Sequence, residues 1–286
     1  FGIDRDPFAV DLAKVTLLLA KKLALDEAHT ALDDSAKSLG FDFDQPLPLE
    51  NLDDRIHCKD ALLTDWPPAD IIIGNPPFQS KNKMQEEFGP KYLQEIRSRY
   101  PDIPGRADYC VYWFRRTHDE LQDGGRAGLV GTNTIRQNYS REGGLDYIVG
   151  SGGTITEAVS TMVWPGDAVV HVSIVNWIKG CSKDDKKLSW QEGDVRDGNL
   201  SSTTVDRIPS SLTTKLDVTT ATVLRANANS EVCHQGQTHG HDGFLISPTE
   251  AAELIHASPK NREILFPYLI GEELLSVGAP TRYVID

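Results

Sequence analysis

The sequence predicts an α/β fold with a mostly parallel sheet and an antiparallel hairpin at one edge. From residue 1 to residue 150, short apolar segments alternate with segments of helical periodicity, as in strand–helix–strand units. Two segments rich in β-branched residues, 155–163 and 169–178, then follow one another across the turn sequence Trp164-Pro165-Gly166-Asp167. Successive strands joined by a tight turn pair antiparallel, so we expect this hairpin at the edge of the sheet.

The first elements follow from apolar spacing and from proline. Residues 1–4 are predicted to form a strand, and Asp6-Pro7 then opens a helix, because proline is tolerated in the first helical turn. Apolar residues at helical spacing continue that helix, namely Phe8, Leu12, Val15, Leu19 and Leu23. Residues 26–54 are polar and irregular, and residues 56–58 form the second predicted strand.

The central elements alternate in the same way. Residues 70–74 contain three successive isoleucines and predict a strand that is buried on both faces. Helical patterns cover residues 83–100 and 108–122, and a Gly-Gly pair ends the second. An apolar strand is predicted at 126–131, and residues 134–150 are partly helical.

The composition changes after residue 180, where Ser, Thr, Asp, Asn and Gly dominate up to residue 245. Within this region, Lys183 to Lys187 is interpreted as a solvated turn. Ser247-Pro248-Thr249-Glu250 then has the capping-box pattern that starts a helix. We place a boundary near residue 195, which gives a first domain over 1–195 and a second region over 196–286.

The composition argues against three classes of protein: membrane-spanning proteins, disulfide scaffolds and nonspecific DNA-binding proteins. The 286 residues contain no apolar run approaching 18 residues, which argues against a membrane span. The four cysteines form no CxxC pair, which argues against a disulfide scaffold and fits a reducing cytoplasm. The net charge of −13 is unfavourable for nonspecific DNA binding, because that binding depends on Lys and Arg at phosphates.

A tetrapeptide directly after the isoleucine strand carries the strongest chemical signal. Asn75-Pro76-Pro77-Phe78 lies where ligands bind in parallel sheets, at the carboxyl end of a strand. The two prolines stiffen the loop, and the Asn75 amide and the Pro76 carbonyl both supply acceptor oxygens. Together they suit an NH2 group on a planar ring, and Phe78 suits stacking on that ring. The alternative interpretation is a proline-rich turn after a strand.

A second cluster of chemically interesting residues is weaker. Cys233-His234, His239 and His241 match no common zinc spacing and lie among glycines, so no metal site is expected.

Several stretches together resemble the adenine-N6 DNA methyltransferases of the gamma type, and more narrowly the fused type IIG, MmeI-like restriction–modification enzymes. The matching stretches are Phe1 to Pro7, Cys58 to Leu62, Gly74 to Phe78, Arg106 to Tyr109 running to Trp113-Phe114, Gly128 to Asn133 and Trp164 to Ala168. The tail from Asn261 to Asp286 resembles the beginning of that group's target-recognition region.

The resemblance implies roles for individual residues. Asp4 would accept the ribose hydroxyls of S-adenosylmethionine, and Asp60 would accept from the cofactor's adenine amine, with Ala61 against its ring. Asn75, Pro76, Pro77 and Phe78 would form the catalytic loop, which holds N6 and stacks on the target adenine. Asp108 is assigned to the cofactor site. Trp164 is assigned to contacts with the flipped base or DNA.

Each assignment has a structural alternative. Asp4 fits an acid at a helix N-terminus, and Asp60 fits a loop acid after a strand. Asp108, with Tyr109 and Trp113 nearby, fits a helix cap and core aromatics equally well. Trp164 fits a tryptophan that packs its own turn.

The resemblance also implies a larger enzyme. The fold would be a Rossmann-like class I methyltransferase sheet, truncated at its N-terminal strand and followed by the start of a mixed target-recognition region. The family's glycine loop for the cofactor would lie upstream of Phe1, so we expect the isolated fragment to be inactive. The partner would be double-stranded DNA with a flipped adenine, and the same polypeptide can carry a nuclease domain in this group.

Two other functions remain open from the sequence. The Asn-Pro-Pro-aromatic loop also serves methylation of RNA and of protein glutamine, because an amide NH2 presents similar donors. A non-catalytic DNA-recognition or scaffold piece is the third interpretation.

Overall fold

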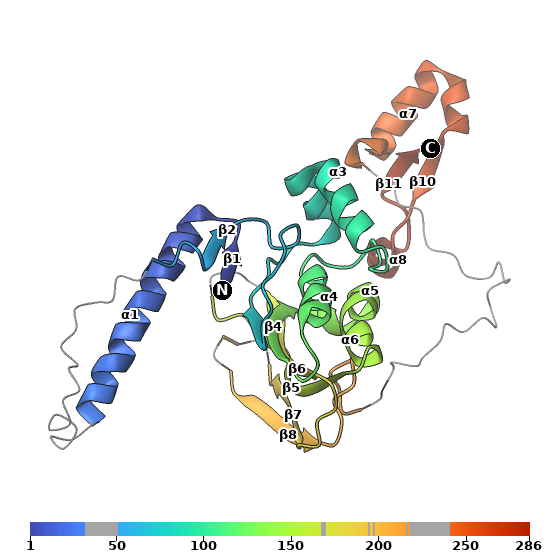
Figure 1. Ribbon diagram of the computed structural model, residues 1–286. Helices are drawn as coiled ribbons and strands as arrows, with labels where there is room; N and C mark the ends of the chain where they lie inside the picture. The colour runs from blue at the N-terminus through green and yellow to red at the C-terminus, as the bar shows by residue number, and fades with distance from the viewer. Residues whose placement is uncertain (32–50, 167–169, 194, 197, 216, 218–240) are drawn as a thin grey trace, which may run out of the picture. The chain divides into compact units, whose positions relative to one another are not determined.

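The computed structural model describes residues 1–31, 51–166, 170–193, 195–196, 198–215, 217 and 241–286 (Figure 1). Its contacts divide the chain into two compact units, Phe1–Ala221 and Thr222–Asp286. The boundary predicted near residue 195 precedes this division. In the described part of the chain, no helix is both long enough and apolar enough to cross a membrane.

The first unit has the mixed α/β architecture that the sequence predicts. Its opening elements are β1 (Gly2–Asp4), α1 (Pro7–Ala31), β2 (Ile56–Cys58), β3 (Ile71–Gly74), α3 (Lys81–Arg99), α4 (Val111–Glu120) and β4 (Arg126–Thr132). The helix predicted from Asp6-Pro7 begins at Pro7, and it continues through residues 26–31, which the sequence pattern had left irregular. Helix α3 is kinked at Gly89, where φ is 76°, a conformation that glycine adopts without a steric cost.

The second half of this unit contains short helical turns and four strands. They are η1 (Asn133–Arg136), α5 (Asn138–Arg141), η2 (Glu142–Asp146), α6 (Tyr147–Gly150), β5 (Gly153–Val163), β6 (His171–Lys179), β7 (Lys186–Gln191) and β8 (Leu200–Val205). The predicted partly helical stretch 134–150 and both predicted hairpin strands are therefore confirmed, while residues 167–169 of the turn lie outside the described residues.

Two sheets organise these strands. β1 and β2 form a parallel pair, and six further strands form a mixed sheet in the order β3-β4-β6-β5-β7-β8. β3 and β4 are parallel, β6 is antiparallel to both β4 and β5, and β7 is parallel to β5. The carboxyl ends of the parallel neighbours β3 and β4 consequently meet at one edge of the sheet.

The hairpin is antiparallel, but the prediction that it forms the sheet edge is wrong, because β7 and β8 extend the sheet beyond it. The interpretation of Lys183 to Lys187 as a solvated turn is also wrong at its end, since β7 starts at Lys186. Lys186 is 7% exposed, and its Nζ donates to the carbonyls of Ser182 (2.9 Å) and Asp184 (2.6 Å). Polar residues can thus occupy an interior strand where each buried group finds a partner.

The isoleucine strand is not buried on both faces, as its composition predicted. Ile71 and Ile73 are 66% and 81% exposed, whereas Ile72 packs against the core. Alternate residues of a strand point to opposite faces of the sheet, and Ile71 and Ile73 share the face that is left open. Only the face shared with the helices is covered by the described residues.

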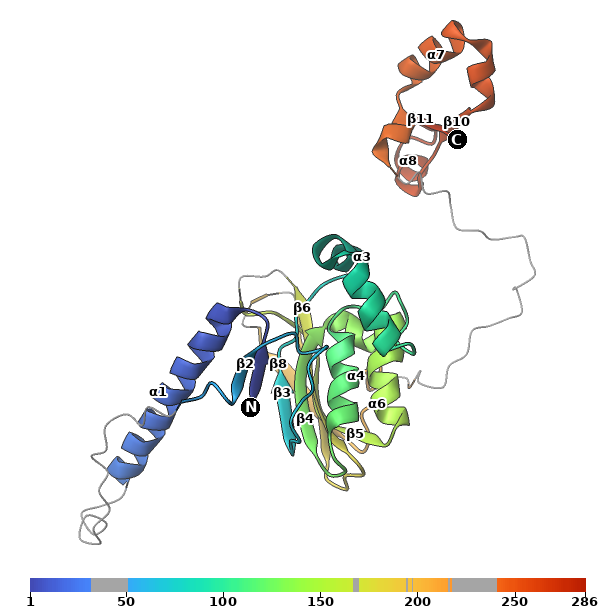
Figure 2. The ribbon, with the colours of Figure 1, turned by 45° about the horizontal axis from the view of Figure 1, so that its top comes forward.

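The hydrophobic core lies between this sheet and the helices that cover one face of it. Figure 2 shows α4 and α6 on that face, beside β4 and β5. Phe114 of α4 stacks on Trp177 of β6, with ring centroids 5.8 Å apart and an interplanar angle of 18°. Both side chains are almost fully buried, so α4 is anchored to the sheet by aromatic packing.

The second unit has a small antiparallel sheet in the order β10-β11-β9. Its elements are η3 (Asp242–Phe244), β9 (Leu245–Ile246), α7 (Pro248–Ala257), η4 (Pro259–Glu263), β10 (Leu265–Tyr268), α8 (Gly271–Ser276) and β11 (Arg282–Ile285). The predicted capping box is confirmed: Ser247 Oγ accepts from the Glu250 backbone N–H at 3.2 Å, and the Glu250 carboxylate accepts from the Ser247 backbone N–H at 2.8 Å.

Replacing Ser247 with alanine is expected to destabilise this unit by about 1 kcal/mol, because the start of α7 loses the side-chain oxygen that caps it. Urea unfolding followed by circular dichroism measures the change. Ser258→Ala is the matched control, since Ser258 ends the same helix without a side-chain cap. Equal destabilisation by both substitutions would contradict the capping role.

Candidate functional site

The candidate site lies at the carboxyl ends of the parallel strands. Asn75 to Phe78 follow β3 directly, and Gly74 is in register with Leu129 of the parallel neighbour β4. In the other parallel pair, Asp4 is in register with Cys58, two residues before Asp60. Both pairs therefore deliver the predicted polar residues where their strands end.

The catalytic loop predicted from sequence is arranged for contact with a ligand. Asn75 is exposed, and no described residue hydrogen-bonds its side-chain amide. Pro76 is buried beneath it, while Pro77 is exposed. Phe78 is half-buried and meets the half-buried Trp164 edge-on, with ring centroids 6.1 Å apart. The loop thus presents a free amide beside a supported aromatic ring.

The two predicted carboxylates are joined through the backbone. The Lys59 N–H donates to the Asp4 carbonyl at 2.8 Å, and Asp4 Oδ1 accepts from the Asp6 N–H at 2.8 Å. Asp60 Oδ1 accepts from the Leu62 N–H at 2.9 Å, and its Oδ2 accepts from the Tyr92 hydroxyl at 2.8 Å. Asp4 is exposed and Asp60 is half-buried, so the Asp60 carboxylate has the more fixed orientation.

An aromatic cluster surrounds Tyr92. Its hydroxyl contacts the Tyr109 hydroxyl, and Phe88 packs against both rings. The Arg5 guanidinium lies over the Phe88 and Tyr92 rings, 5.4 Å and 5.9 Å from their centroids, which joins the end of β1 to α3.

Burial is the main cause that raises the pKa of both tyrosines in this cluster, well above the usual range for Tyr92 and to about 12 for Tyr109. Both hydroxyls therefore remain protonated at neutral pH. Tyr92 can consequently donate to the Asp60 carboxylate throughout that range.

Backbone contacts connect this cluster to the predicted catalytic loop. The Tyr109 N–H donates to the carbonyl of Gln79, the residue after Phe78, at 3.0 Å. Asp60, Tyr92, Tyr109, Gln79 and Phe78 thus form an unbroken chain of contacts. The structure brings the predicted cofactor carboxylate and the predicted base-stacking ring into one connected region.

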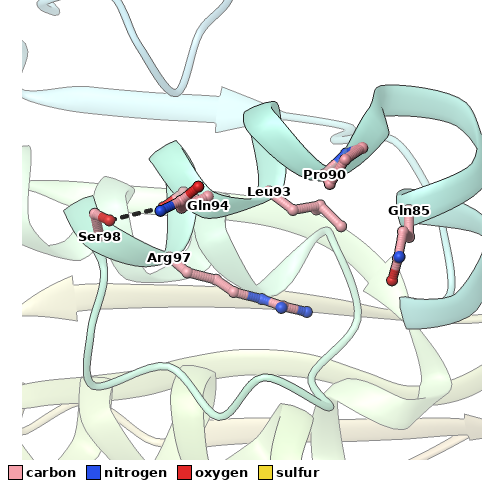
Figure 3. Close-up of a pocket in the computed structure, with 6 residues that line it drawn as sticks. All are labelled: Gln85, Pro90, Leu93, Gln94, Arg97 and Ser98. Carbon is pink, nitrogen blue, oxygen red and sulfur yellow. Dashed lines mark hydrogen bonds between the residues drawn. The ribbon is translucent and has the colours of Figure 1, made fainter.

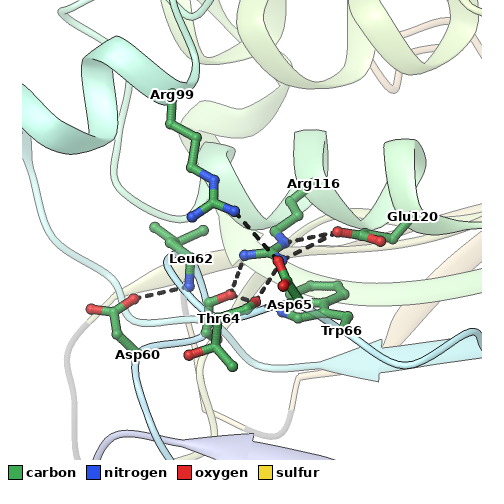
Figure 4. Close-up of polar contacts among 9 residues, drawn as sticks. Asp60, Leu62, Thr64, Asp65, Trp66, Arg99, Arg116 and Glu120 are labelled. Atoms are coloured by element: carbon green, nitrogen blue, oxygen red, sulfur yellow. Dashed lines mark hydrogen bonds and ion pairs between the residues drawn. The ribbon is translucent and has the colours of Figure 1, made fainter.

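The loop after Asp60 is held by one buried arginine (Figure 4). Arg116 of α4 is 3% exposed, and its guanidinium donates to the carbonyls of Ala61 and Thr64, both at 2.6 Å. The same group pairs with Glu120 at 3.2 Å and lies over the Trp66 ring at 4.7 Å. Arg116 therefore fixes the backbone that carries Asp60 and Ala61.

Asp108 lies at the start of α4 and faces the end of β4. Its Oδ2 accepts from the hydroxyls of Thr132, at 2.9 Å, and Thr134. Its own N–H donates to Ser140 Oγ at 3.0 Å. These contacts anchor the helix to the strand end, and a role of Asp108 in cofactor binding stays a prediction.

Sequence reasoning missed three residues that shape this region: Arg5, Tyr92 and Arg116. A signal existed for Arg116, because it falls four residues after the buried Tyr112 and so lies on the buried stripe of α4. A charged residue at such a position requires buried partners. Tyr92 and Arg5 carry no comparable local signal, since their partners are distant in sequence.

The described residues form two concave pockets of note, and neither is lined by the predicted site residues. One is built from α3 alone (Figure 3), by Gln85, Pro90, Leu93, Gln94, Arg97 and Ser98. The other lies between η1–α5 and the segment after β8. In the described ranges, no group of His, Cys, Asp and Glu could hold a metal ion, while Cys233, His234 and His239 lie outside them.

Comparison with solved structures finds a similar fold in a restriction–modification enzyme. The type IIL restriction–modification enzyme MmeI, solved in complex with DNA, superposes with a TM-score of 0.57 at 20% identity over 80% of this chain. The chain spans 32% of the length of that MmeI structure. A modification subunit of a putative type I restriction enzyme from Vibrio vulnificus matches at 16% identity over 51% of this chain and 31% of its own length, with a TM-score of 0.36.

A search of curated proteins gives no match. The family model described as the MmeI DNA-methyltransferase domain matches residues 1–190, which include every predicted site residue. The match covers about two thirds of the chain and spans the parallel pairs β1–β2 and β3–β4, the Asn-Pro-Pro-Phe loop and the hairpin. The chain therefore belongs to the family of MmeI-type DNA-methyltransferase domains.

Proposed function

We propose that this chain is the catalytic part of a DNA methyltransferase that transfers a methyl group from S-adenosylmethionine to adenine N6 in a specific sequence. The observation that carries the proposal is the exposed Asn75 amide, which no described residue hydrogen-bonds, beside Phe78 at the carboxyl end of β3. Such a group, held by a stiff loop, is available to a substrate without rearrangement.

The loop suits an exocyclic amine. The Asn75 side-chain oxygen and the Pro76 carbonyl each accept one hydrogen bond from the N6 amino group. Two acceptors draw the nitrogen toward tetrahedral geometry, which frees its lone pair from the ring and stabilises the positive charge that develops on it. Phe78 stacks on the flipped adenine, and Trp164 supports Phe78 through its edge-on contact.

The residues at the ends of β1 and β2 fit the cofactor by the chemistry of their groups. Asp4 offers an exposed carboxylate for two ribose hydroxyls, and Asp60 offers a half-buried carboxylate for an adenine amine, with Ala61 against the ring. Both carboxylates accept hydrogen bonds, and the ribose hydroxyls and the adenine amine of a nucleoside donate them. When bound, S-adenosylmethionine supplies a methyl group that its sulfonium already activates.

The family match supports a proposal about the wider setting. We propose a Rossmann-like class I methyltransferase arrangement, double-stranded DNA as the substrate, and a place in a restriction–modification system. The family match and the DNA-bound MmeI structure support DNA over RNA or protein glutamine. A nuclease domain in the same polypeptide fits this setting.

The test uses the full-length protein with isotopically labelled S-adenosylmethionine. Plasmid DNA, total RNA and a glutamine-containing release-factor protein are offered separately, and the products are digested and analysed by mass spectrometry. We expect label in N6-methyladenine from DNA alone. Label in RNA or in protein glutamine would show that the substrate is not DNA. Absence of label from all three acceptors would support a non-catalytic DNA-recognition or scaffold piece.

A further inference from the structure

A pocket beside the candidate site has no role in the proposed chemistry. Two segments line it, one from η1 and α5 and the other from the stretch after β8; they contribute Arg136, Gln137, Asn138 and Arg141, and Ser211, Thr213 and Lys215. η1 follows β4 directly, and Thr132 at the end of β4 is hydrogen-bonded to Asp108. The pocket therefore belongs to the same edge of the sheet as the candidate site.

The pocket is basic in an acidic chain. Its lining includes Arg136, Arg141 and Lys215 and no carboxylate, whereas the chain carries a net charge of −13. Arg141 is paired with Asp146 at 3.1 Å. Within the described part of the chain, Arg136 and Lys215 have no ion-pair partner, so two positive charges remain uncompensated there. Such a concentration of one sign attracts an anion.

Two buried polar atoms in the lining also lack partners. Ser211 is 7% exposed, and its Oγ is buried without a hydrogen bond to any described residue. The Nε of Arg136 is buried in the same way. Buried polar atoms without partners are rare in folded proteins. Both atoms belong to residues that line the pocket.

The backbone is strained at the same place. Asn138 and Leu212 have φ angles of 45° and 48°, and they are the non-glycine residues with positive φ that the described ranges contain. Asn138 lines the pocket, and Leu212 lies between the lining residues Ser211 and Thr213. Backbone strain of this kind concentrates at ligand sites, where the fold holds side chains in a set position.

We propose that this pocket binds one phosphodiester of the DNA backbone, close to the nucleotide that is methylated. This inference rests on the proposed function. A phosphodiester combines a negative charge with acceptor oxygens, which suits the two uncompensated cations and the hydroxyls of Ser211 and Thr213. Phosphate contacts set the register of a protein on DNA, and a held phosphate would steady the backbone from which the base leaves.

The experiment measures how salt changes DNA affinity. Fluorescence anisotropy with the full-length protein and a short labelled duplex of mixed sequence gives the binding constant over a series of salt concentrations. Removing one phosphate contact reduces the slope of log K against log salt by about 1. We expect that reduction for Lys215→Gln and again for Arg136→Gln. The exposed Lys215 keeps the test valid where the partly buried Arg136 variant folds poorly.

Lys187→Gln is the matched control, because Lys187 is an exposed lysine of β7 that pairs with Glu157 at 3.7 Å and lies outside the pocket. Its slope is expected to equal that of the wild type. An unchanged slope for Lys215→Gln, or the same reduction of the slope for Lys187→Gln, would overturn the inference. Equal Lys215-dependent slopes with RNA would overturn the assignment to DNA.

The methylation assay separates this inference from the proposed function. If the wild-type protein methylates DNA but the variants show no change of slope, the pocket does not bind a DNA phosphate and the proposed function still holds. If DNA binding depends on Lys215 but no methyl group is transferred, the proposed catalytic function is wrong and the phosphate-binding role of the pocket still holds.

Discussion

Replacing Asn75 with alanine is expected to lower kcat for DNA adenine methylation by about 100-fold or more, the usual effect of losing one preorganised polar group at a reacting atom. The Asn75 oxygen is one of two acceptors that reshape N6, and the Pro76 carbonyl cannot replace it. Because Asn75 is exposed and has no partner among the described residues, the substitution should change folding stability by no more than about 0.5 kcal/mol.

The measurement is a single-turnover assay with saturating methyl donor, together with a calorimetric titration of the donor. Donor affinity should be unchanged, since Asn75 lies on the loop assigned to the target base. Asn75→Asp is the informative companion variant: it keeps acceptor oxygens of similar geometry and should retain more activity than the alanine variant. A full-length Asn75→Ala protein with wild-type kcat would leave the Asn75–Phe78 loop without a catalytic role.

The position of the predicted catalytic loop could be inferred from sequence because it depends on local rules. Three isoleucines followed by Asn75-Pro76 predict a strand and a stiff turn, and parallel neighbours bring their carboxyl ends together. The capping box at Ser247 was predictable for the same reason, since both of its hydrogen bonds span three residues.

The sheet beyond the hairpin was not predictable from composition. β7 contains Lys186, Ser189 and Gln191 at buried positions, and such residues usually indicate a loop. They are buried because groups outside the strand receive them. Lys186 donates to carbonyls of the turn just before β7, and Gln191 donates to the Val195 carbonyl just after it and accepts from the Val163 N–H of β5, both at 2.6 Å. The contact with Val163 spans 28 residues, so it is set by tertiary structure, which a local pattern does not contain.

The residues that hold the candidate site in position could not be predicted from sequence for the same reason. Asp60 was identified by its place after a strand, but its hydroxyl partner Tyr92 lies 32 residues away on α3. The exposure of Ile71 and Ile73 likewise depends on which face of the sheet the rest of the fold covers, and the local sequence does not specify this. The residues assigned to contact a ligand are thus more visible in the sequence than those that hold them in position.

Substitution of Arg116 is expected to have the second large effect, on the binding of the methyl donor. Ala61 and Thr64 both present their carbonyls to its guanidinium, and a planar fork with several donors can reach both while also pairing with Glu120. Trp66 closes the arrangement: its ring lies under the guanidinium and its Nε1 donates to the Ala61 carbonyl at 2.8 Å. One side chain therefore determines the path of the backbone that carries Asp60.

We expect Arg116→Met to raise the KM for S-adenosylmethionine about tenfold, which corresponds to about 1.4 kcal/mol of lost preorganisation in the loop. The kcat at saturating donor should fall much less, because the Asn75 loop is held by separate contacts. Folding stability should also drop by about 1–3 kcal/mol, since the Thr64 carbonyl loses its donor. Arg116→Lys should recover part of the affinity, because a single ammonium reaches one carbonyl at a time.

Arg115→Met separates this effect from a general weakening of α4. Arg115 is the adjacent arginine of the same helix; it pairs with Asp102 and Asp119 and lies over the Tyr147 ring at 3.4 Å, without contacting residues 60–66. It should lower stability and leave the KM for the donor near the wild-type value. If both variants raised that KM equally, or if Arg116→Met changed stability alone, the arginine would be a packing residue, and the orientation of Asp60 would have to depend on Tyr92 and the Leu62 N–H.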